Sequence, residues 1–147
     1  MSTTAIGTTL DAIQTGLSAV SGLSEVNVFS VPVSWEVGGE ECIWMGDATF
    51  NEEESAMGGE RGEVWDIEAQ VWGKLCSWQG DTESTGREAR DRLLDLYALI
   101  ETYINDTYTG TYPNVVMTAG VLRQYNLPEG YRCVMDFTLT MGNIKNP

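Results

Sequence analysis

The chain has 147 residues, 42% of them hydrophobic, with 22 acidic residues, 8 basic ones and no histidine. This length and apolar content predict a single folded domain over residues 1–147, and no apolar run is long enough for a membrane span. The net charge of −14 argues against a protein that binds nucleic acid by neutralising phosphates.

The first predicted element is an amphipathic helix over residues 3–22. One apolar stripe recurs at spacings of 4, 3, 4 and 3: Ile6, Leu10, Ile13, Leu17 and Val20. Thr3 or Thr4 can cap its start, and Gly22 suits its end. The N-terminal residues show no basic region and no cleavable apolar run, so we expect no export signal.

Two strands and an acidic insert follow the helix. A short strand alternates through Val26 and Val28 and ends before Pro32, and a more apolar one runs from Cys42 to about Phe50. The insert, Asn51 to Glu63, is rich in Glu and contains Gly58-Gly59. We therefore expect an acidic loop or hairpin arm near residues 51–63.

The next stretch, EVWDIEAQVWGKLCSW, reads as one very long strand from Glu63 to Trp78. Apolar or small residues occupy every second position from Trp65 to Leu75. At about 3.4 Å per residue, Val64 to Trp78 would span about 50 Å, against about 40 Å for the diameter of a compact chain of this length. Either the strand projects beyond the body, together with the acidic arm, or Gly73 bends it back onto the sheet. We favour projection.

A second helix and two strands complete the predicted order. The helix buries a stripe made of Ala89, Leu93, Leu96 and Ile100 with Tyr103 or Ile104. The strands VVMTAGVLRQYNL and YRCVMDFTLTM are joined by PEG; alternate residues from Tyr131 to Met141 face one way, and Arg132, Asp136, Thr138 and Thr140 face the other. The predicted fold is α+β: a mainly antiparallel sheet with two helices packed on one face, in the order α-β-β-β-α-β-β.

No pattern in the sequence indicates catalysis, a cofactor or a metal. Histidine is absent, no glycine-rich loop has the lysine that a phosphate site needs, and Cys42, Cys76 and Cys133 lack metal-ligand spacing. The Glu52–Glu60 loop does not match the register of a calcium loop. We expect reduced thiols, solvated carboxylates and no enzymatic activity.

Two tryptophans, Trp72 and Trp78, lie on the polar phase of the long strand. They would stack across strands on the outer face of the sheet, or that face would be covered by another subunit, since interface centres are enriched in Trp, Tyr and Arg.

The chain resembles the tail terminator (tail completion) proteins of long-tailed bacteriophages, especially those of phages that infect actinobacteria. The resemblance covers nearly the whole chain and rests on a series of words: TTLDAIQTGLSAV, VNVFSVPVSWE, a strand ending in GD, the acidic hairpin, VWDIEAQVWGKLCSWQGDT, GREARDRLLDLYALIE and GVLRQYNLPEGYRCVMDFTLTM.

This resemblance implies a structural virion protein rather than an enzyme. Such proteins form a homohexameric ring on the last ring of the tail tube, stop tube growth and meet the head–tail connector or stopper, while DNA passes through without specific binding. The implied location is the head-proximal end of the tail, reached by assembly in the host cytoplasm, with no membrane partner. The residues we expect at contacts are Glu52, Glu53, Glu54, Glu60, Arg61, Glu63, Trp72 and Trp78.

Two alternatives stay open. A head–tail connector, stopper or other neck adaptor shares this size and composition. A small ligand-binding or enzymatic α+β domain would need a concave site with convergent polar groups, for which the sequence offers no cluster.

Overall fold

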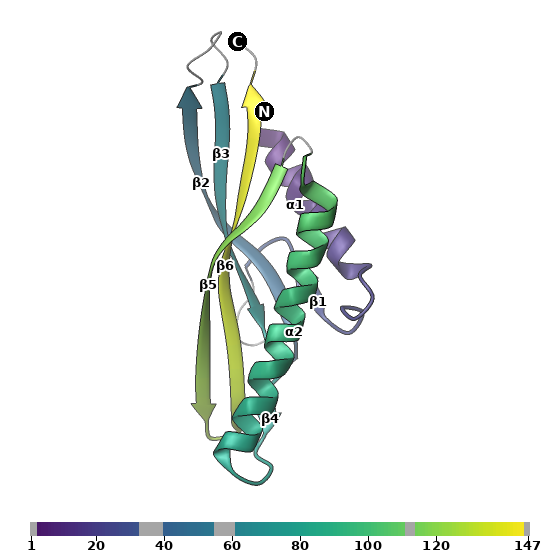
Figure 1. Cartoon of the computed structure of the whole chain (residues 1–147), viewed down its shortest axis with the longest axis vertical. Helices are drawn as coiled ribbons and strands as arrows, with labels where there is room; N and C mark the ends of the chain where they lie inside the picture. The colour runs from purple at the N-terminus through teal and green to yellow at the C-terminus, as the bar shows by residue number, and fades with distance from the viewer. Residues whose placement is uncertain (1–2, 33–39, 55–60, 111–113, 146–147) are drawn as a thin grey trace.

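The computed structural model describes residues 3–32, 40–54, 61–110 and 114–145. Within them the chain is an α+β domain of two helices and six strands (Figure 1). The elements run in the order α1 (Thr3–Ser18), β1 (Asn27–Phe29), β2 (Cys42–Glu54), β3 (Arg61–Trp72), β4 (Cys76–Ser77), α2 (Thr82–Tyr108), β5 (Asn114–Leu127) and β6 (Gly130–Lys145). The predicted fold class is confirmed at this level, but the predicted order is wrong because it lacks β4.

The sheet is mostly antiparallel. β5, β6, β3 and β2 lie side by side in that order with antiparallel pairing, and β4 pairs with the first two residues of β6. The pairing of β1 with β2 is parallel and covers only Cys42 to Trp44 on β2, which makes the sheet mixed. A short turn joins β5 to β6, whereas the pairing of β3 with β6 brings together strands separated in sequence by β4, α2 and β5.

The long strand predicted from Glu63 to Trp78 is two strands. β3 ends at Trp72, and the amide N of Gly73 donates to the carbonyl of Cys133 at 2.8 Å. A Cβ at Gly73 would lie 3.1 Å from that same carbonyl oxygen, so the close approach of the two backbones favours glycine here. The chain then returns to the sheet as β4. The strand therefore ends just before Gly73, as in the bend that was the alternative to projection at this end of the strand.

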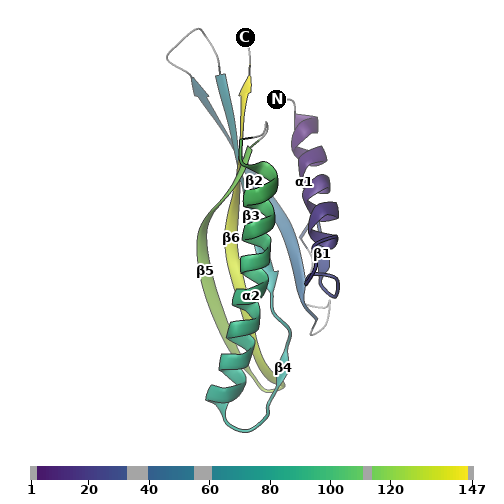
Figure 2. The same cartoon turned by 45° about the vertical axis from the view of Figure 1, so that its right-hand side comes forward.

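Length is instead gained at the opposite end of β3. The strand starts at Arg61, and β2 runs to Glu54, four residues past the predicted end at Phe50. Figures 1 and 2 show β2, β3 and β6 continuing past the C-terminal end of α2. The acidic segment is thus a hairpin arm at one end of an elongated sheet, with its residues 55–60 outside the described part of the chain.

Both helices cover the same face of the sheet (Figure 2). The predicted stripe of α2 is confirmed, with Ala89, Leu93, Leu96, Ile100 and Ile104 buried. These side chains share one core with Ile67, Ala69 and Val71 of β3 and with alternate residues of β6 from Cys133 to Met141. Burial of one sheet face therefore follows the period-2 pattern read from the sequence.

Helix α1 joins the same core at its other side. Ile6, Ile13 and Leu17 are buried, whereas Val20 lies beyond the helix, which ends at Ser18 rather than at residue 22. The tight turn that follows includes a hydrogen bond from the amide of Ala19 to the carbonyl of Gly16. A Cβ at Gly16 would overlap the hydroxyl and ring of Tyr103 on α2, so the Tyr103 side chain packs directly on α1 at this glycine.

Candidate interaction surfaces

The arm residues singled out in the sequence lie in paired backbone at the projecting end of the sheet. The register places Glu52 opposite Glu63 and Glu54 opposite Arg61, and Arg61 opposite Lys145 of β6. Glu53 lies between them on β2, and Glu60 is outside the described residues.

Trp72 lies far from the arm, at the opposite end of β3. It is only 2% exposed and packs with Cys42 and Val134 in a second, small apolar cluster on the outer face of the sheet, the face that carries no helix. Phe29, Trp44 and Tyr125 surround this cluster. Contacts within its own chain therefore account for the burial of Trp72, and it has little surface left for another subunit.

A cation stacks on this tryptophan. The guanidinium carbon of Arg132 lies 5.2 Å from the centroid of the Trp72 ring, and the Arg132 side chain is 4% exposed. Its Nε and one terminal nitrogen each donate over 2.9 Å, to the carbonyls of Gly73 and Glu40. Burial lowers the pKa of Arg132. This arginine therefore holds the end of β3 and the start of β2 together.

Trp78 contacts a different part of the chain. Its indole N–H donates to the carbonyl of Leu127 at 3.0 Å, and its ring meets that of Tyr131 edge to face, with centroids 6.1 Å apart. It thus fastens the segment before α2 to the β5–β6 turn. The structure does not bring Trp72 and Trp78 together with the arm.

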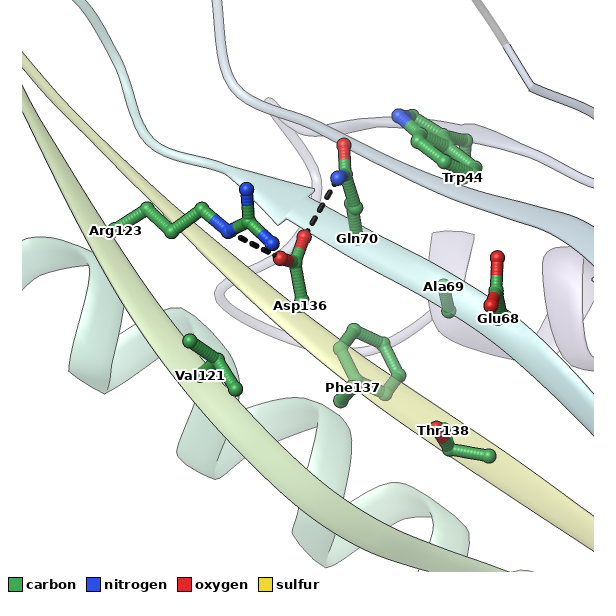
Figure 3. A pocket seen from close by; sticks show the side chains of 9 residues that line it. All are labelled: Trp44, Glu68, Ala69, Gln70, Val121, Arg123, Asp136, Phe137 and Thr138. Carbon is green, nitrogen blue, oxygen red and sulfur yellow. Dashed lines mark hydrogen bonds and ion pairs between the residues drawn. The ribbon is translucent and has the colours of Figure 1, made fainter.

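A groove of about 360 Å³ crosses the outer face of the sheet (Figure 3). The carboxylate of Asp136 accepts from Gln70 and from Arg123, both at 2.6 Å, and Gln70 in turn accepts from the indole N–H of Trp72 at 2.7 Å. Figure 3 shows Glu68 and Trp44 on the other side of the groove from Arg123. The charge of Asp136 is thus paired with that of Arg123 within the groove.

An acidic cleft lies on the other side of the molecule, between α2 and the start of β2. Its centre is a two-pronged ion pair in which Arg92 donates to both carboxylate oxygens of Glu41, at 2.8 and 2.9 Å. Glu25, Glu40, Glu88 and Asp95 also line the cleft, beside Lys74 and Cys76. Hydrogen bonding to Glu41 raises the pKa of Arg92. The pair ties α2 to β2 and lies away from the arm.

The three cysteines are free thiols. Burial raises the pKa of Cys42 and of Cys133 to about 11, and burial together with the charge of Glu88 raises that of Cys76. A thiol must ionise to act as a nucleophile, so these environments disfavour thiolate chemistry at neutral pH. In the described part of the chain no group of three or more Cys, Asp and Glu residues is placed to hold a metal ion.

The residue pattern did not predict the contacts that Arg132 makes on the outer face of the sheet. Arg132 was predicted to lie on the polar side of β6, and it does, but that side is buried near Trp72. Val134 on the same phase was the available signal, since an apolar residue among polar ones indicates local cover. The Glu41–Arg92 pair joins residues 51 positions apart, and no local pattern predicts it.

No protein-family model matches this chain, and no curated protein matches it. Among the described residues, neither helix combines the length and the apolar character needed to cross a membrane.

Proposed function

We propose that this chain is a tail terminator of a long-tailed bacteriophage: a structural virion protein that forms a ring on the tail tube, ends its polymerisation and joins the tail to the head connector. The proposal rests on the resemblance of the residue pattern described above, which extends along nearly the whole chain, to that family. The resemblance implies a sheet with helices on one side, and the fold described above has that arrangement.

The shape of the subunit supports a role in assembly. The β2–β3 arm and the end of β6 project past α2, so they offer backbone and charged residues beyond the main core. In this proposal the arm residues Glu52 to Glu54, Glu60, Arg61 and Glu63 contact a neighbouring copy or the tube. The tube protein, a second copy and the connector or stopper are the partners.

The charge supports the same role. A ring of six copies carries 6 × 14 = 84 formal negative charges. Where these charges line the channel, they keep passing DNA from adhering, because like charges repel and the phosphates find no cation to displace their counterions. A ring whose channel is neutral or basic would contradict this part of the proposal.

The test is an amber mutation in the gene, with lysates viewed by electron microscopy. We expect filled heads and separate tails of uncontrolled length, and normal particles when the same phage grows on a suppressor host. Tails of normal length that fail to join heads would instead indicate a connector or stopper. Normal particles without the protein would refute a role in the neck altogether.

A deletion tests the arm separately. A variant lacking residues 52–60 should keep the folded subunit, because the buried core residues lie outside the arm, and should fail to support ring or tube contacts. Circular dichroism checks the fold, and complementation of the amber phage checks assembly. If tails end normally with the deletion variant, the arm has no part in these contacts.

A further inference from the structure

We propose that neighbouring copies of this chain join through their sheet edges: β5 of one copy pairs, antiparallel, with the free edge of β2 in the next. The inference rests on the proposed ring and assigns the joint between its subunits. It comes from the strand order, the edge composition and the exposed apolar residues.

The sheet has two long edges without a partner among the described residues. β5 pairs with β6 on one side only, along its whole length from Asn114 to Leu127. On the opposite side of the sheet, β1 covers β2 only at Cys42–Trp44. Pro32, after β1, still lies against β2 at Gly46, since a Cβ there would be 3.2 Å from its Cγ. The backbone of β2 from Ala48 to Glu54 therefore has one set of hydrogen-bonding groups unused by any described strand.

Strand direction allows the two edges to meet in register with the sheet. β5, β6, β3 and β2 alternate in direction, since each neighbouring pair is antiparallel. A copy rotated about an axis along the strands brings its β5 beside β2 with the alternation unbroken. Because both helices lie on one face, every helix in such a ring stays on the same side of the continuous sheet.

The charges of the two edges favour this pairing over the symmetric ones. β5 carries one charged residue, Arg123, whereas β2 carries Asp47 and the Glu52–Glu54 run. A β2–β2 joint would bring two acidic strands together, which is unfavourable. A β5–β5 joint would be a closed two-fold contact that leaves both β2 edges open and forms no ring.

The exposed apolar residues mark the same level of both edges. The register places Thr49, Asp66, Thr140 and Val116 in one row across the outer face. Val116 at the β5 end of this row is 46% exposed on the outer face. Phe50, next to Thr49 at the β2 end, is 42% exposed and points to the opposite face, where it pairs with Trp65. A strand added at either edge would cover them. A long edge strand with so little charge is otherwise prone to uncontrolled pairing.

Cross-linking tests the joint directly on the full chain. In a C76S background, whose remaining cysteines are buried, T49C and V116C are made singly and together and treated with a short bis-maleimide. On a denaturing gel we expect each single variant to run as an uncross-linked monomer and an equimolar mixture of the two to give a covalent dimer. The double variant should give a ladder of covalent species that stops at the closed ring. T118C, on the same face of β5, replaces V116C if that variant does not fold.

Controls and contrary results are equally specific. T102C, on an exposed position of α2, paired with T49C should give no dimer. A dimer from V116C alone would show symmetric β5 pairing and overturn the proposal, as would the absence of any link in the mixture of folded variants in concentrated solution. A ladder in a protein that proves dispensable for tails would keep the joint and reject the terminator role.

Discussion

Arg132 offers the sharpest test of the packing on the outer face. We predict that Arg132→Met destabilises the protein far more than Arg123→Met, although both replace an arginine on the same face of the sheet. Arg132 is 4% exposed and donates to the carbonyls of Gly73 and Glu40. The side chain of Arg123 is 58% exposed and is paired with Asp136.

The expected costs follow from these contacts. Methionine fills much of the volume of Arg132 but leaves two carbonyls without their donor, at about 1–3 kcal/mol each. Loss of the cation over Trp72 adds about 0.5–2 kcal/mol. Removing the desolvated charge offsets part of this, since burial lowers the pKa of Arg132. We expect a net loss of about 2–4 kcal/mol for Arg132→Met and about 0–1 kcal/mol for the exposed pair of Arg123.

Urea unfolding followed by tryptophan fluorescence measures both variants. With a slope of about 1–3 kcal/mol per molar urea, a loss of about 3 kcal/mol lowers the midpoint by at least about 1 M. Equal slopes for the two variants and the parent would show that the same transition is compared. If Arg132→Met is no less stable than Arg123→Met, the buried arginine does not hold the strand ends together and the reasoning fails.

Three further outcomes are expected. Gly16→Ala should lower the free energy of unfolding by about 1–3 kcal/mol, because the new methyl group meets the side chain of Tyr103. Gly7→Ala, in open space on the same helix, should raise it by up to about 1 kcal/mol. Equal effects of the two substitutions would contradict the contact between Gly16 and Tyr103. Leu93→Ala, at a fully buried position, should lower the free energy of unfolding by about 2–5 kcal/mol. Leu94→Ala, at the neighbouring position that is 41% exposed, should lower it by about 1 kcal/mol or less. Thermal or urea unfolding measures both variants. Because burial raises the pKa of Cys42 from 9.0 to about 11, unfolding releases a thiol proton in that interval; stability should fall as the pH rises from 9.0 to about 11, and less steeply in Cys42→Ala.

The sequence predicted the helices and strands correctly where an element buries one face in a regular period. The stripes of α1 and α2 and the alternation of β6 from Cys133 to Met141 repeat the same environment every turn or every second residue, so a local window contains the signal. The end of β3 was not readable in this way. The alternation of apolar and small residues continues through Gly73 to Leu75, and only the backbone of β6, some 60 residues further along the chain, decides that the strand stops at Trp72.

The candidate surfaces also divide into those that local sequence predicts and those that depend on distant segments of the chain. The acidic arm was predicted from composition, because a run of Glu with two glycines is local information. Arg132 and the Glu41–Arg92 pair were not, since each depends on segments that meet only after the sheet has formed. Trp72 was correctly placed on the outer face, but its burial there depends on Cys42 and Val134 from two other strands.

Strands of 12 to 16 residues outrun the helix that covers them, so the far end of the sheet has less core beneath it than the middle. The part of the sheet that continues past α2 lacks the helix cover that buries the middle of the same face. In the proposed ring, a neighbouring copy would supply the contacts that this extra strand length lacks in one subunit. The arm and the two open edges therefore call for the same explanation, and the cross-linking ladder tests it without reference to any relative.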